Sequence, residues 1–77
     1  MKAYVLVSGE PGKSSDIFDN ISDIDVVESI EAVTGSHDFV VTVEADSFES
    51  FTDPVFGEIR GIDGVNSTTT LIVVGSE

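Results

Sequence analysis

The chain has 77 residues, 40% of them apolar, and its fifteen acidic residues against three basic ones give a net charge of −12. This length predicts one domain over residues 1–77, and the absence of cysteine together with a single histidine excludes disulfides and an ordinary structural zinc site. The negative charge repels phosphate backbones, so we expect no direct binding of nucleic acid.

The first half of the chain predicts a strand, a helix and a second strand. Residues 2–8 are apolar or β-branched and precede the turn formers of residues 9–12, which indicates a strand and a loop. Ser14 or Ser15 is expected to cap a helix, because apolar residues follow at helical spacing: Ile17, Phe18, Ile21 and Ile24. Residues 26–34 predict a half-buried strand with Ile30 and Ala32 on one face.

The second half predicts the same order of elements. Residues 35–38 form a tight hairpin connection into a strand over 39–45. The next helix begins at Ser47, or at Asp53 with Pro54 as its first helical residue, and a turn before Pro54 followed by a kink is a third alternative. Residues 61–64 end this helix, and residues 65–74 form the last strand, apolar on both faces from Leu71.

An internal sequence repeat, or echo, relates the two halves of the chain at an offset of 38 residues. Ile21, Ile24, Asp25, Val27 and Ser29 recur in the same spacing as Ile59, Ile62, Asp63, Val65 and Ser67. Two copies of one strand–helix–strand unit predict an α+β, ferredoxin-like βαββαβ fold, in which a four-stranded antiparallel sheet carries both helices on one face.

The other face of such a sheet is uncovered within one chain. Tyr4, Leu6 and the apolar end of the last strand lie on or near this face in the predicted arrangement. A small domain without disulfides or metal commonly gains stability by oligomerisation. We therefore expect the chain to dimerise through its sheet.

No set of residues points to catalysis. His37 beside Asp38 has the chemistry of an oriented general base, but no nucleophile or second histidine accompanies it, and no strained elbow surrounds Ser36. Gly9, Gly12 and Lys13 lack the full phosphate-loop pattern, and the acidic residues lack EF-hand spacing. We expect no catalytic residues, no metal and no cofactor.

The hydroxyl run of residues 67–70 is the most informative polar feature. Threonine is a good strand former, which alone explains much of the run. Thr68 and Thr70 nevertheless share one face and offer donors and acceptors to a zwitterion, whose ammonium group Asp38 could meet. The backbone N–H groups of residues 35–38 could meet its carboxylate.

Five segments together resemble the C-terminal effector domain of the Lrp/AsnC (feast/famine) transcription regulators, over essentially the whole chain: AYVLV, PGK, AVTGSHDFVVTVEA, IRGIDGV and TTTLIVV. VTGSHD is similar to the family's binding turn, and Thr68 with Thr70 matches its threonine pair. The resemblance implies a ferredoxin-like domain that dimerises through its sheet, assembles into an octamer or another ring of dimers, and binds amino-acid effectors between dimers. The ligand-binding residues it implies are Thr34, Gly35, Ser36, His37, Asp38, Thr68 and Thr70.

Two features depart from the family pattern. His37 replaces an aromatic residue of the turn, and the sequence begins directly with the effector domain, without a helix-turn-helix. The acidic surface with few lysines is typical of a high-salt cytoplasm, so we expect a stand-alone, haloarchaeal, cytoplasmic member that lies outside any membrane.

The function expected from this resemblance is amino-acid sensing and oligomerisation in transcription regulation, with full-length Lrp/AsnC regulators as partners. Two other functions remain open. A small dimeric α+β barrel enzyme, such as a monooxygenase or isomerase, would hold His37 in a deep pocket between sheet and helices. A purely structural oligomerisation domain would bind no ligand.

Overall fold

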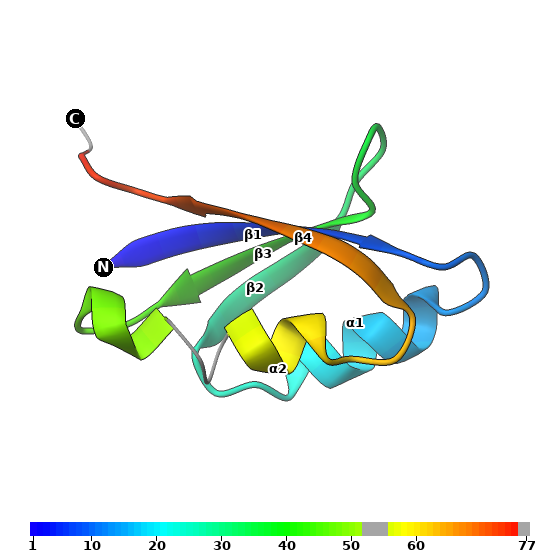
Figure 1. Cartoon of the computed structure of the whole chain (residues 1–77), viewed down its shortest axis with the longest axis horizontal. Coiled ribbons are helices and arrows are strands. Elements are labelled where there is room, and N and C mark those ends of the chain that lie inside the picture. The colour runs from blue at the N-terminus through cyan, green and yellow to red at the C-terminus, as the bar shows by residue number, and fades with distance from the viewer. Residues whose placement is uncertain (52–55, 76–77) are drawn as a thin grey trace.

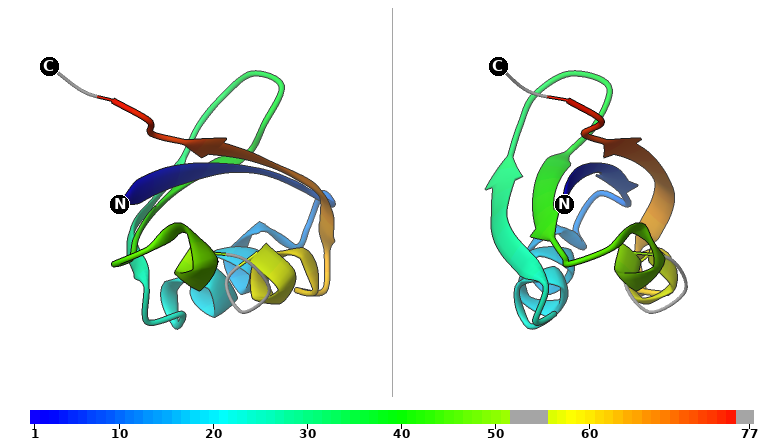
Figure 2. Two further views of the ribbon diagram at one scale, coloured as in Figure 1. Left: turned by 60° about the vertical axis from the view of Figure 1, so that its left-hand side comes forward. Right: turned by 90° about the vertical axis from the view of Figure 1, so that its left-hand side faces the viewer.

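Four strands pair into one antiparallel sheet in the order β2-β3-β1-β4, and the helices lie on one of its faces (Figure 1, Figure 2). The computed structural model describes residues 1–51 and 56–75. The elements in chain order are β1 (Lys2–Gly9), α1 (Ser14–Ser22), β2 (Val27–Ala32), β3 (Phe39–Glu44), the 3₁₀ turn η1 (Phe48–Phe51), α2 (Gly57–Arg60) and β4 (Val65–Ile72). The predicted ferredoxin-like α+β fold is confirmed.

The core lies between the two central strands and the helices. Alternate residues of β1 and β3 point toward the helices because side chains in a strand alternate between its faces. Isoleucines from both helices complete this layer. The buried residues are Ala3, Val5, Val7, Ile17, Ile21, Phe39, Val41, Val43 and Ile59.

The start of α1 differs from the prediction. Lys13 occupies the N-cap position and no side chain caps the helix, so the predicted cap at Ser14 or Ser15 is wrong. The N–H of Lys13 donates to the carbonyl of Glu10 at 3.1 Å, and the carbonyl of Lys13 already accepts from the N–H of Ile17 at 3.0 Å. The helix therefore follows the turn directly, with Lys13 rather than a serine at its N-cap.

The helical segment of the second half is short. The 3₁₀ turn at Phe48–Phe51 agrees with the alternative of a turn before Pro54, whereas a start at Asp53 or Pro54 falls outside the described residues. The predicted end of α2 is confirmed, since the N–H of Gly61 donates to the carbonyl of Gly57 at 2.9 Å.

The second strand is shorter than predicted and carries a bulge. Val27 lies opposite Val43 while Ser29 lies opposite Thr42, so Glu28 is the extra residue. Ile30 is half-buried opposite Val41, but Ala32, at the end of the strand, is exposed.

The echo holds for the positions of the elements and fails for their pairing. Ile21 and Ile59 are both fully buried, and Val27 and Val65 each begin an edge strand. The echo equivalent of Ile30 is Thr68, and that of Val41 is Ala3, yet Thr68 lies opposite Val7. The two edges of the sheet are therefore not equivalent.

Candidate functional site

The loop between β2 and β3, residues 33–38, extends away from the sheet (Figure 1). The N–H of Val33 donates to the carbonyl of Asp38 at 2.9 Å and closes the loop, and the N–H of Asp38 donates to the carbonyl of Val7 at 2.9 Å. Gly35 has a φ of 113°, a conformation that other residues rarely adopt. The loop shape therefore depends on this glycine.

Asp38 fastens the loop to the end of β1. One carboxylate oxygen, Oδ2, accepts a hydrogen bond of 2.8 Å from the backbone N–H of Gly9. A carboxylate that accepts from a backbone N–H makes a stronger bond than a neutral acceptor. Part of the hydrogen-bonding capacity of Asp38 thus serves the fold of the loop.

His37 meets β1 on the side of the sheet that the helices leave open. Its Nδ1 lies 3.2 Å from Oγ of Ser8, and Ser8 Oγ donates to the carbonyl of Ser36 at 3.4 Å. Ser8 follows Val7, which faces the core, so the Ser8 side chain is on the opposite, outer face. His37 therefore does not lie in a pocket between sheet and helices, as a barrel enzyme would require.

Thr68 and Thr70 share the face of β4 that is turned toward the helices. They lie opposite the buried Val7 and Val5 and are half-buried themselves. The exposed Ser67 and Thr69 lie opposite Ser8 and Leu6 on the outer face.

One chain therefore does not bring the loop residues and the two threonines together into the predicted ligand site. The structure brings Ser36 and His37 together with Ser8, a residue that the sequence reasoning missed, and leaves Thr34 and Ser36 exposed. The available signal in the sequence was Ser8 itself, a polar residue at an outward position near the end of a largely apolar strand. A site that joins the loop of one copy to the threonines of another stays a prediction.

A shallow hollow lies at the opposite end of the outer face. Its volume is about 450 Å³, and no predicted site residue lines it. Its lining residues are Met1, Lys2, Tyr4, Glu44, Val73, Val74 and Gly75.

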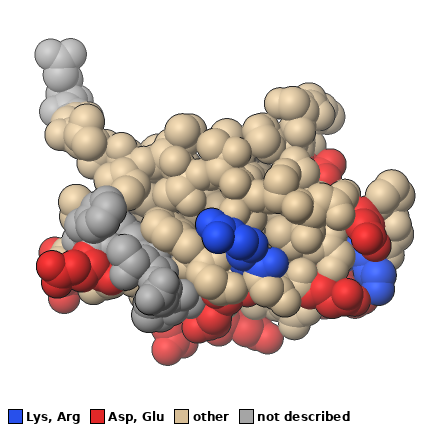
Figure 3. Space-filling view, viewed as in Figure 1, with Lys and Arg blue, Asp and Glu red and all other residues tan. Residues whose placement is uncertain are grey.

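The outer face itself is apolar at its centre. Leu6 of β1 lies opposite Val40 of β3, and Tyr4 lies opposite Leu71 of β4, which is 49% exposed. Lys2 lies over the Tyr4 ring, with Nζ 6.0 Å from the ring centroid. In Figure 3 acidic side chains gather along the lower rim, under the helices, while the upper rim is largely free of charge.

Within residues 1–51 and 56–75, the acidic residues and the histidine form no group of three that could hold a metal ion. No helix in the same residues is long and apolar enough to cross a membrane.

One family model matches nearly the whole chain. The model of the Lrp/AsnC ligand binding domain matches residues 2–76. An uncharacterized HTH-type transcriptional regulator of Pyrococcus horikoshii is 27% identical over 71 residues, which are 92% of this chain and 45% of that protein. The chain thus spans about half the length of this curated relative.

Solved structures share the fold. A protein of Thermus thermophilus superposes with a TM-score of 0.92 at 26% identity, covering 99% of this chain and 95% of that one. A transcriptional regulator of Neisseria meningitidis, solved as an L-Met complex, superposes with a TM-score of 0.84 at 21% identity, covering 96% and 49%.

Proposed function

Because the chain belongs to the Lrp/AsnC ligand-binding domain family, a family of transcription-regulator domains, we propose that it senses an amino acid and assembles through its sheet. The family match over residues 2–76 is the observation that carries this proposal. The Neisseria relative of the same fold was solved with L-Met, which supports an amino acid as the class of effector.

Two parts of the fold support a binding site shared between copies. The loop of residues 33–38 is fixed at Asp38 and Ser8. The N–H of Asp38, predicted to meet the carboxylate, donates to the carbonyl of Val7 instead, whereas those of residues 35–37 donate to no backbone carbonyl among the described residues. Thr68 and Thr70 are half-buried, and their hydroxyls make no hydrogen bond within the described residues. Because the loop contacts the outer face and the threonines face the helices, the effector would join two chains.

The apolar centre of the outer face supports dimerisation. Tyr4, Leu6, Val40 and Leu71 are neighbours across β1, β3 and β4, and each is at least partly exposed in one chain. Burying apolar surface is worth about 25 cal/mol per Å² before the costs of association. A second sheet packed on this face would therefore stabilise a domain of 77 residues substantially.

The proposed partners are further copies of this chain, in a dimer or a ring of dimers, and full-length Lrp/AsnC regulators in the cytoplasm. The Thermus protein has nearly the same extent as this chain, which covers 95% of it. Copurification with a DNA-binding relative, and the mass of the protein purified from its own cells, would test these points.

The decisive experiment is a thermal-shift screen of the twenty amino acids in molar KCl. A ligand at 100 times its Kd adds about 2.7 kcal/mol to the free energy of unfolding. Asp38→Asn keeps a side-chain oxygen for the N–H of Gly9 and removes the charge that would meet the ammonium group. We expect this variant to stay folded and lose the shift, and a folded wild-type protein that responds to no amino acid would defeat the proposal.

A further inference from the structure

Arg60 differs from the other two basic residues in its surroundings. Lys13 Nζ pairs with Oδ2 of Asp63 at 3.0 Å, and Lys2 lies over the ring of Tyr4. Arg60 is exposed and forms no ion pair with any described residue. In a chain of net charge −12, a guanidinium group with no carboxylate partner among the described residues is a local exception.

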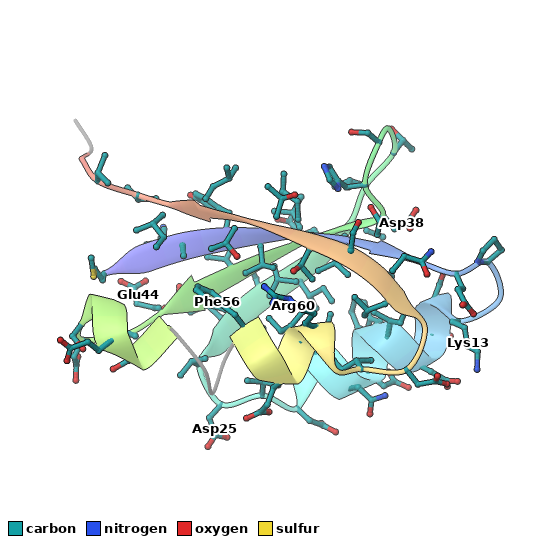
Figure 4. The ribbon with its side chains drawn as sticks, viewed as in Figure 1. Lys13, Asp25, Asp38, Glu44, Phe56 and Arg60 are labelled. Atoms are coloured by element: carbon teal, nitrogen blue, oxygen red, sulfur yellow. The ribbon has the colours of Figure 1, made fainter. Side chains whose placement is uncertain are left out.

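The fold places Arg60 beneath the edge strand β4. α2 lies under β4 (Figure 2). In Figure 4 the Arg60 side chain points from α2 toward the sheet, near Phe56 one helical turn earlier. The exposed guanidinium therefore lies on the side of α2 that faces the sheet.

The same edge carries the two threonine hydroxyls that face the helices. Thr68 and Thr70 project from β4 toward the layer that contains α2, and neither hydroxyl has a hydrogen-bond partner among the described residues. A guanidinium binds a carboxylate through paired N–H donors, and hydroxyls add further donors. β4 and α2 thus both carry hydrogen-bond donors on the same side of the sheet.

We propose that Arg60, with Thr68 and Thr70, binds the side-chain carboxylate of an acidic amino acid, so that aspartate or glutamate is the preferred effector. This inference rests on the proposed function and names the class of its ligand. The α-carboxylate goes to the N–H groups of the loop in a neighbouring copy, and the second carboxylate goes to Arg60.

The net negative charge of the chain bears on which effectors need a cation in the site. Fifteen acidic residues disfavour the approach of any anion, and a zwitterion without net charge needs no additional cation. An acidic effector, in contrast, needs a fixed positive group where its second carboxylate rests. Arg60 is the cation that lies on the same side of the sheet as Thr68 and Thr70 without an ion pair in the described residues.

The test is calorimetry in molar KCl with four ligands: aspartate, asparagine, glutamate and glutamine. Each pair has nearly the same shape and differs by one negative charge. We expect the acid to bind about 10- to 100-fold more tightly than its amide, the range for a hydrogen-bonded charged group. Arg60→Gln should remove this preference and keep binding of the amide. Lys2→Gln makes the same change of charge on the outer face and should retain the preference.

Each other outcome has a defined meaning. Equal binding of acid and amide by the wild-type protein, or an unchanged preference in Arg60→Gln, overturns the role of Arg60 and leaves amino-acid sensing intact. A change of oligomer mass in Arg60→Gln without a change of preference assigns Arg60 to a carboxylate of a second copy and also overturns it. No binding of any amino acid by folded protein removes the proposed function and this inference together.

Discussion

The carboxylate of Asp38 accepts a hydrogen bond of 2.8 Å from the backbone N–H of Gly9, joining the β2–β3 loop to the end of β1. An added Cβ on Gly9 would meet the side chain of Ile17, a fully buried residue of α1. The loop proposed to bind the effector is therefore fixed to a point that packs directly on the core.

Replacing Asp38 tests this attachment in the absence of ligand. Asp38→Ala should lower the free energy of unfolding by about 1 kcal/mol, because the N–H of Gly9 loses its acceptor in a partly hydrated position. Asp38→Asn should cost less, since its side-chain oxygen can accept the same bond. Denaturant unfolding in molar KCl measures both, and equal losses would contradict the role of the hydrogen bond.

Adding a methyl group at Gly9 tests its packing. Gly9→Ala should destabilise the protein by about 1–3 kcal/mol, because the new Cβ overlaps Ile17 and lies 3.2 Å from the carbonyl oxygen of Gly64. Gly57→Ala is the matched control: it adds the same group in α2 with no described atom within 4 Å, and should be neutral or stabilising by up to about 1 kcal/mol. Similar effects at both positions would refute the close approach at Gly9.

A charge on the outer face tests dimerisation. Leu71→Glu should shift the protein to a folded monomer in sedimentation at micromolar concentration, because the carboxylate would be buried against a second sheet. Phe18→Glu is the control on the helix side, where Phe18 is 39% exposed and its ring centroid lies 6.3 Å from that of Phe39. Phe18→Glu should lower Tm without changing the mass of the oligomer in sedimentation. A wild-type monomer would defeat the prediction.

The ion pair between Lys13 and Asp63 predicts a pH dependence. The hydrogen bond and the charge of Asp63 raise the pKa of Lys13 above its usual value of 10.5. The pair therefore stabilises the folded state fully below the unfolded pKa, and this contribution is lost as the pH rises through the folded pKa. The difference in Tm between wild type and Asp63→Asn should be constant near neutral pH and shrink above pH 10.5. A difference that grows there would contradict it.

The net charge of −12 predicts stabilisation by salt. The Debye length falls from about 10 Å at 0.1 M to about 3 Å at 1 M, which screens repulsion among the acidic residues. A gain of about 2 kcal/mol would raise Tm by roughly 10 °C for a domain of this size. Calorimetry in a KCl series measures this, and a Tm independent of KCl would argue against adaptation to high salt.

The elements could be predicted from the sequence because their signals are local. Alternation in residues 39–45 and the spacing of Ile17 and Ile21 record which faces are buried, and both faces are as expected. The prediction of the N-cap residue of α1 was wrong because it rested on the general preference of serine for N-caps. In this protein the turn from Glu10 to Lys13 sets the first helical residue.

The sequence by itself determined the fold, through two apolar periodicities repeated 38 residues apart. Only the tertiary structure decided which polar groups meet. The register of β4 on β1 sets Thr68 opposite Val7, on the face turned away from His37. The register of β3 on β1 brings Ser8 to His37 and Gly9 to Asp38 across 29 residues of chain. Register is set by which residues must face the core and by the geometry of the connections, so it depends on segments far apart in the chain.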